Sequence, residues 1–129
     1  MEFKYHIDKA SRIVSLTGEP SSLEVWKQTL LALFADPDFE AGFNFLSDRR
    51  HSEEPRSPDF IRAALAFLGS HADKMGRCKW ATVVSTTVAY GMGRMAQILS
   101  ERTNVEVEVF TDIEEARQWL SGETTLPKE

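Results

Sequence analysis

Several features that would mark a specialised class of protein are scarce or missing in this sequence. There is one cysteine, Cys78, so no intramolecular disulfide can form, which agrees with a reducing compartment. The longest apolar stretch, residues 30–35, is far too short to cross a bilayer, and residues 1–6 do not start an apolar run of signal-peptide length. We therefore expect a cytoplasmic protein without a membrane span.

Positive charge and catalytic motifs are also scarce. The chain has 15 lysines and arginines against 20 aspartates and glutamates, and its basic residues are scattered, so nucleic acid is not an expected partner. The three histidines, His6, His51 and His71, have no ligand partner at metal-binding spacing. No nucleophile elbow of the Gly-x-Ser-x-Gly kind occurs. We expect no metal, no cofactor and no enzymatic activity.

What the sequence does contain is typical of one globular domain. Its 129 residues can bury a single core, and 42% hydrophobic and 27% charged residues are ordinary values for a folded protein. We assign residues 1–121 to the domain and 122–129 to a polar tail. Cys78 directly precedes an apolar strand and has no neighbour that would lower its pKa, so a small buried hydrophobe is the favoured interpretation.

Hydrophobic periodicity predicts strands and helices that alternate along the chain. Alternating or β-branched runs predict five strands, at residues 3–8, 12–17, 42–46, 79–85 and 105–110. Apolar residues at helical spacing, with capping boxes at Ser21 and Thr111, predict four helices, at residues 21–35, 57–76, 88–102 and 111–120. The order is therefore ββαβαβαβα.

This order predicts an α/β fold with a mixed, mostly parallel five-stranded sheet. Helices between successive strands require parallel pairing with right-handed crossovers, whereas the first two strands form a hairpin. Residues 105–109 alternate valine with glutamate, which indicates a sheet with one face partly open. We expect the helices to lie mainly on one face, and a doubly wound sheet is the alternative.

Three segments resemble a known family: KWATVVS at 79–85, YGMGRM at 90–95 and VEVFTDIEEARQWL at 107–120. They are similar to the bacterial SpoIIAA-like group, which has the fold of the STAS domains of anti-sigma-factor antagonists. The resemblance implies a non-enzymatic regulatory or protein-binding module. The group is also compared with the lipid-binding Sec14 or CRAL-TRIO domains, so the alternative is a carrier of a small molecule or lipid.

The resemblance also directs attention to the connection between the third strand and the second helix. STAS antagonists carry a phosphorylated serine there, in an Asp-x-Ser-Gly motif that is missing from residues 47–58 of this chain. Ser57 is the candidate phosphoacceptor by position. Because Ser57-Pro58 is a preferred opening of a helix, N-capping is the favoured interpretation of this serine.

The same loop concentrates positive charge. Arg49, Arg50, His51 and Arg56 could hold a phosphate or carboxylate if their side chains converge. The acidic residues of the loop, Asp48, Glu53 and Glu54, would offset them. A solvated loop of mixed charge is the alternative, and the sequence favours it because exposed ion pairs need no functional cause.

A second candidate anion site is formed by Ser85, Thr86 and Thr87. They lie where a parallel strand ends and a helix begins, which is where open α/β sheets bind ligands and where free amides attract anions. Hydroxyl residues are also the usual N-caps of helices. Capping is therefore favoured over ligand binding.

Gly91-x-Gly93-x-x-Ala96 imitates a dinucleotide-binding fingerprint, but it does not directly follow a strand. We place both glycines inside a helix, where each costs about 1 kcal/mol relative to alanine and so needs a packing reason. Close approach of another helix or of a second subunit would supply one. On this basis we expect a homodimer with a contact near Tyr90, Gly91 and Gly93.

Overall fold

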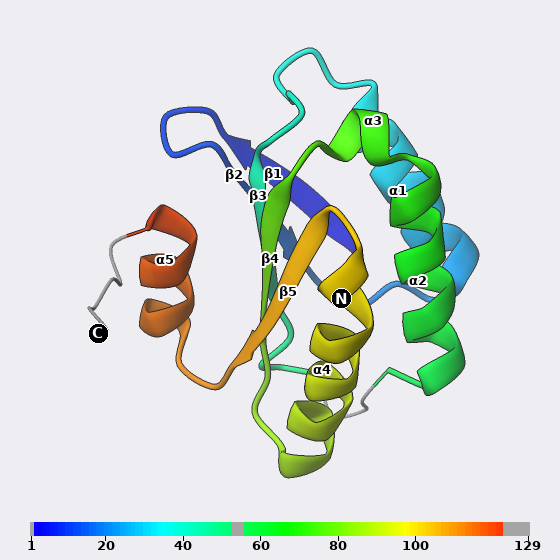
Figure 1. The fold of residues 1–129 in the computed structure, drawn as a ribbon, viewed down its shortest axis with the longest axis vertical. Coiled ribbons are helices and arrows are strands. Elements are labelled where there is room, and N and C mark those ends of the chain that lie inside the picture. The colour runs from blue at the N-terminus through cyan, green and yellow to red at the C-terminus, as the bar shows by residue number, and fades with distance from the viewer. Residues whose placement is uncertain (1, 53–55, 123–129) are drawn as a thin grey trace.

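A five-stranded sheet forms the centre of the molecule, with its strands in the order β1-β2-β3-β4-β5 (Figure 1). The structure is a computed structural model and describes residues 2–52 and 56–122. The strands are β1 (Lys4–Asp8), β2 (Ile13–Thr17), β3 (Asn44–Asp48), β4 (Cys78–Val83) and β5 (Val105–Phe110). β1 and β2 are antiparallel, and the other neighbouring pairs are parallel. The predicted α/β class and the mixed five-stranded sheet are confirmed.

The helices connect successive strands, and short polar motifs set where they begin. They are α1 (Leu23–Phe34), α2 (Pro58–Ser70), α3 (Ala72–Met75), α4 (Thr87–Leu99), the 3-10 turn η1 (Ser100–Arg102) and α5 (Ile113–Ser121). The N-caps of α1 and α5 are Ser22 and Asp112, each one residue later than the predicted capping boxes. Both caps accept a backbone N–H from the first helical turn, so the capping principle holds although the predicted positions were wrong.

Two further boundaries differ from the prediction. α2 ends at Ser70 and a separate single turn, α3, follows, because the backbone leaves helical geometry at His71. β3 begins at Asn44 and extends to Asp48, two residues later than expected at each end. The shift of β3 is important for the site described below, because it places Arg49 immediately after the strand.

The helices occupy both faces of the sheet. α1, α2 and α4 share one face, whereas α5 is the one helix of the described part of the chain on the opposite face (Figure 1). The expectation that the helices cover one face is therefore wrong for α5. The reason is that the central strands are apolar on both sides: Phe45 and Trp80 face the larger helical layer, and Leu46 and Ala81 face α5.

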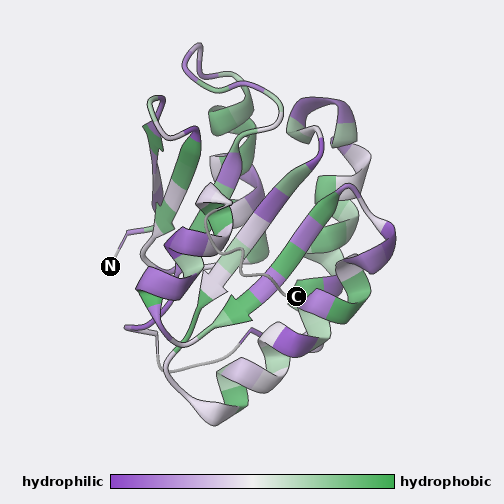
Figure 2. Ribbon diagram, turned by 60° about the vertical axis from the view of Figure 1, so that its left-hand side comes forward, coloured by the Kyte–Doolittle hydropathy of each residue, from purple (hydrophilic) through white to green (hydrophobic). Residues whose placement is uncertain are grey.

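Beyond the reach of α5, no helix among residues 2–52 and 56–122 covers the second face of the sheet. β5 alternates hydrophobic and hydrophilic residues along its length (Figure 2). Its valines are buried against α4 and η1, while Glu106 is exposed and Glu108 is half-buried on the other side. The valine and glutamate alternation therefore indicates which part of the sheet is uncovered.

Aromatic residues fill the space between the sheet and the larger helical layer. The rings of Phe45 on β3 and Trp80 on β4 stack with their centroids 4.7 Å apart, and Trp26 of α1 packs against Trp80 at 6.4 Å. Phe45 is fully buried and Trp26 nearly so. Burial of large aromatic side chains dominates the energetics of a core this small. None of the helices in the described ranges is long and apolar enough to span a membrane.

The outer edge of β5 is closed by side chains instead of a sixth strand. Three of its backbone amides donate hydrogen bonds to polar side chains that come just before the strand or from the end of α4. The pairs are Val105 N to Thr103 Oγ1 at 3.1 Å, Val107 N to Ser100 Oγ at 3.2 Å and Val109 N to Gln97 Oε1 at 3.3 Å. Ser100 is buried as a result.

Candidate functional site

Three loops meet at the carboxyl ends of the parallel strands β2, β3 and β4. They begin after Thr17, Asp48 and Val83 and lead into α1, α2 and α4. Because carboxyl ends of parallel strands share one edge of a sheet, residues far apart in sequence come together there, next to the N-termini of the following helices. This edge contains every candidate site residue named from the sequence.

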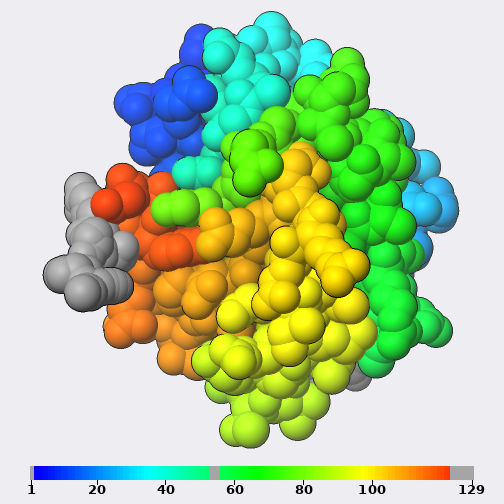
Figure 3. Space-filling view, viewed as in Figure 1, coloured from blue at the N-terminus to red at the C-terminus, as the bar shows by residue number. Residues whose placement is uncertain are grey.

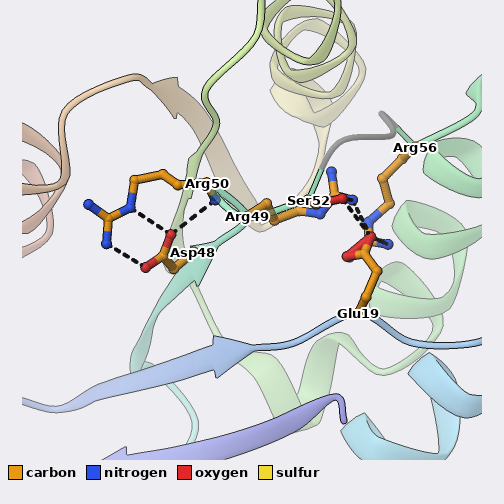
Figure 4. Close-up of polar contacts among 6 residues, drawn as sticks. All are labelled: Glu19, Asp48, Arg49, Arg50, Ser52 and Arg56. Carbon is orange, nitrogen blue, oxygen red and sulfur yellow. Dashed lines mark hydrogen bonds and ion pairs between the residues drawn. The ribbon is translucent and has the colours of Figure 1, made fainter. Parts of the chain in front are cut away.

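Arg49 and Arg56 converge on one carboxylate, that of Glu19 (Figure 4). Arg49 Nη2 donates to Glu19 Oε2, and Arg56 Nη1 lies 3.6 Å from the same oxygen. Ser52 Oγ donates to Glu19 Oε2 as well, at 3.1 Å. The side chains of Arg49 and Arg56 are only 7% and 16% exposed. Two of the three predicted arginines thus form a nearly buried cluster around an acidic residue that sequence analysis did not single out.

Arg50 does not belong to this cluster. Its guanidinium binds Asp48 through two hydrogen bonds, of 2.9 and 2.8 Å, on the other side of the loop (Figure 4). These bonds hold the pKa of the Asp48 carboxyl below its ordinary value. The backbone oxygen of Arg50 accepts a hydrogen bond from Ser85 Oγ at 2.9 Å, which links this loop to the next one. Glu53 and Glu54, the other acidic residues expected to offset the arginines, lie outside the described residues.

Arg56 is the least well paired member of the cluster. Its guanidinium carbon lies 4.6 Å from the centre of the Phe60 ring, and its ion pair with Glu19, the one it makes within the described residues, is long. It makes no hydrogen bond with any residue that the structure describes. Burial, and then the charge of Arg49, lower the pKa of Arg56 to about 10, which Glu19 opposes. This is the environment of a buried cation whose charge is only partly balanced.

A cavity of about 90 Å³ that is partly open to solvent lies beside the two arginines. It is bounded by the sheet, by α2 and by α4, and most of its walls are apolar. Representative wall residues are Trp80 of β4, Ala64 and Leu65 of α2, and Ala96 of α4. Arg49 and Arg56 supply the strongly polar part of the lining. The cavity thus combines an apolar body with a cationic end.

The same arginines also line a larger, open cleft of about 760 Å³ on the protein surface. The β2–α1 and β3–α2 loops form its walls, and Glu19 and Ser57 are among its lining residues. Arg49, Arg56 and Phe60 line both the cleft and the cavity, so they lie where the two spaces adjoin.

Two hydroxyl residues of the site, Ser57 and Thr86, are N-caps. Ser57 Oγ accepts from the amide of Phe60 at 3.1 Å at the start of α2, and Thr86 Oγ1 accepts from the amide of Ala89 at 3.1 Å at the start of α4. Ser85, Thr86 and Thr87 are all exposed. The predicted N-capping roles of Ser57 and Thr86 are confirmed.

The two fingerprint glycines lie inside α4, as predicted, but in different environments. Gly93 is buried, and a Cβ added there would lie 2.5 Å from Val109 Cγ2 of β5, whereas Gly91 is exposed with nothing within 4 Å. Gly93 is therefore needed for the approach of a strand of the same chain. The expectation that it lies at a dimer contact is wrong, because Gly93 does not reach the surface.

Cys78 is buried in the main core, as predicted, and burial raises the pKa of its thiol to about 12. A thiol in this state is a poor nucleophile and a poor metal ligand. Within residues 2–52 and 56–122, no three His, Cys, Asp or Glu side chains gather in a way that could hold a metal ion.

Sequence reasoning missed Glu19 and Phe60, the two residues that hold Arg56. A usable signal for Glu19 was present: it follows β2 closely, as Arg49 follows β3, and adjacent parallel strands bring such residues to one edge. The separation of Arg49 and Glu19 by 30 residues concealed the pairing.

In comparisons with known proteins, no family model matches this chain, and no curated protein or solved structure matches it either.

Proposed function

We propose that the protein is a non-enzymatic, STAS-like binding module that holds a small ligand in the cavity between its sheet and helices α2 and α4. The observation that carries the proposal is the cavity itself, whose apolar walls end at two nearly buried arginines. Ligand sites in proteins are concave and mostly apolar, with a few polar groups that orient the ligand. The strand order and the N-terminal hairpin are compatible with the STAS-like fold that the sequence resemblance implies.

The cavity volume limits the size of the ligand. A dry engineered cavity of about 150 Å³ accepts benzene, which has six carbon atoms. In proportion, 90 Å³ accommodates an apolar group of about four carbon atoms. The apolar part of a small molecule therefore matches this space, whereas a whole acyl chain of a membrane lipid is larger than it, and we favour the small-molecule version of the carrier hypothesis.

Native mass spectrometry of the protein purified from its own host tests this proposal. We expect an added mass of a small molecule that is released on denaturation. Ala64→Leu should abolish the added mass by filling the cavity, because Ala64 lines the cavity wall. Ala66→Leu is the matched control, since Ala66 is an exposed residue of the same helix. A bare protein mass, or an adduct that survives Ala64→Leu, would contradict the proposal.

A second candidate function, the protein-binding module implied by the resemblance, is supported by the surface of α4. Val88 and Ile98 are 62% and 57% exposed, and Leu99 and Tyr90 are exposed on the same helix. These four large apolar side chains, exposed on one helix, are the basis of this second proposal. α4 forms the part of the surface between α2 and β5 (Figure 3). We propose a second copy of the chain as the partner, in line with the expected homodimer.

Light scattering at micromolar concentration tests the dimer. We expect twice the monomer mass for the wild-type protein and for Leu31→Asp, which changes an exposed leucine of α1. Ile98→Asp should return the mass to that of a monomer, because it places a charge in the proposed contact. A monomeric wild-type protein would refute the dimer.

A further inference from the structure

The carboxylate of Glu19 occupies the position where the cationic end of the cavity meets the open cleft. It lies against Arg49 and Arg56, and both arginines line the cavity and the cleft. Its own side chain is 40% exposed, and it belongs to the loop between β2 and α1. The side chain can therefore turn outward into water without unfolding any helix or strand.

The pairing within this cluster is incomplete. Arginine and carboxylate groups pair best through two parallel hydrogen bonds. Glu19 uses only Oε2 for Arg49 and Arg56, and its buried Oε1 has no hydrogen-bond partner among the described residues. Arg56, in turn, donates no hydrogen bond to any of those residues. Glu19 Oε1 is thus a buried acceptor with unused hydrogen-bonding capacity, which is costly, and Arg56 is a nearly buried guanidinium whose donors the described residues do not use.

We propose that the ligand of the cavity is a small carboxylate with a short apolar chain, and that its carboxylate replaces Glu19 on Arg49 and Arg56. This inference rests on the proposed function and names the class of ligand. The apolar chain, of about four carbon atoms at most, would occupy the space beside Ala64 and Ala96. A free carboxylate, unlike Glu19, is not tethered to a loop and can present both oxygens to the guanidinium.

Displacement of the Glu19 carboxylate by the ligand would also change the surface of the protein. The loop that carries Glu19 continues through Pro20 to Ser22, the N-cap of α1, and forms one wall of the open cleft. When the ligand takes its place, the Glu19 carboxylate moves into solvent and the wall loses its link to the β3–α2 loop. Ligand binding would thus change the surface of the cleft, which is what a regulatory module requires.

Titration by NMR with sodium butyrate, and with neutral butyramide of nearly the same shape, tests the inference. We expect butyrate to bind the wild-type protein and butyramide to bind at least about tenfold more weakly. Arg56→Gln should weaken butyrate binding about tenfold or more. Arg62→Gln is the control, because Arg62 is an exposed arginine of α2 that pairs with Asp59 and does not line the cavity.

Glu19→Gln gives the decisive result, because the two possible roles of Glu19 predict opposite signs. A residue that only supports the fold of the site would weaken butyrate binding when it is replaced. An internal competitor would instead strengthen it, and we expect at least about a tenfold gain in affinity because the ligand no longer displaces a charged group. This variant also keeps the inference testable if Arg56→Gln does not fold.

Xenon, a neutral probe of apolar cavities, separates failure of this inference from failure of the proposed function. Xenon should shift amide resonances of α2 and α4 in the wild-type protein, in Arg56→Gln and in Glu19→Gln. If xenon binds but butyramide binds as tightly as butyrate, or Glu19→Gln weakens butyrate binding, the carboxylate inference is overturned and the cavity remains a ligand site. If neither xenon nor butyrate binds the wild-type protein, both proposals are overturned.

Discussion

The two glycines of α4 provide a matched pair of substitutions with opposite expected effects on stability. Alanine is favoured over glycine inside a helix by about 1 kcal/mol. A Cβ at Gly91 would meet nothing within 4 Å, so Gly91→Ala should raise the free energy of unfolding by about this amount. A Cβ at Gly93 would lie 2.5 Å from Val109 Cγ2 and 2.8 Å from Val109 Cβ, well inside the usual contact distance between carbon atoms.

No small rearrangement of Val109 removes the clash at Gly93. Val109 is β-branched, so its side chain has little freedom to rotate, and its strand is fixed by pairing with β4. α4 must therefore move away from β5, and overpacking of this kind costs about 1–3 kcal/mol. We take about 3 kcal/mol because two contacts are short, and subtract about 1 kcal/mol for helix propensity. The expected net loss for Gly93→Ala is about 2 kcal/mol.

Thermal unfolding followed by circular dichroism measures both effects. With an unfolding entropy of about 2.1 cal/mol/K per residue over 129 residues, 1 kcal/mol corresponds to about 4 °C. Gly91→Ala should then raise the Tm by about 4 °C, and Gly93→Ala should lower it by about 7 °C. In a Val109→Ala background, Gly93→Ala should lose most of its effect. A Gly93→Ala protein that melts at or above the wild-type Tm would refute the close approach of α4 and β5.

Three other predictions concern single side chains. Hydrogen bonds from Arg50 lower the pKa of Asp48, so their stabilising contribution is present above about pH 4 and is lost as the pH falls through the lower folded pKa. The difference in free energy of unfolding between wild type and Asp48→Asn, measured in urea, should therefore shrink on acidification, and a difference that stays constant would contradict the role of this pair. Ser57→Ala should lower the free energy of unfolding by about 1 kcal/mol and Ser57→Asp should leave it near wild type, whereas loss of a partner in Ser57→Asp alone would indicate a phosphoacceptor. The buried thiol of Cys78, with its pKa of about 12, should react with a disulfide reagent at pH 8 only after unfolding, and rapid labelling of the folded protein would contradict its burial.

The parts of the fold that sequence reasoning predicted are those set by a few neighbouring residues. Ser57-Pro58 opens α2 because a hydroxyl cap and a proline act within one helical turn. The alternation of β5 depends only on the period of a strand. The face on which α5 lies was not predictable in this way. The apolar face of α5 shows that it packs on something, but its location depends on Leu46 and Ala81, which come from two other strands.

The candidate site was half predictable for the same reason. Three arginines in one loop are visible in the sequence, but which of them converge depends on the strand that precedes the loop. Asp48, the last residue of β3, holds Arg50 away, while Arg49 turns toward Glu19. The cavity has no sequence signature at all, since its volume is the space left between side chains of α2, α4 and the sheet after each has taken its rotamer.

The side chains that satisfy the outer amides of β5 decide where this sheet can grow. A strand from another chain adds to a sheet by pairing with free backbone groups at an edge. At β5 the amides of Val105, Val107 and Val109 are already taken, so an incoming strand would first have to displace three hydrogen bonds. Strand exchange or fibril growth would therefore begin at β1, where the alternate residues Lys4, His6 and Asp8 are exposed and present polar groups that disfavour stacking of like chains.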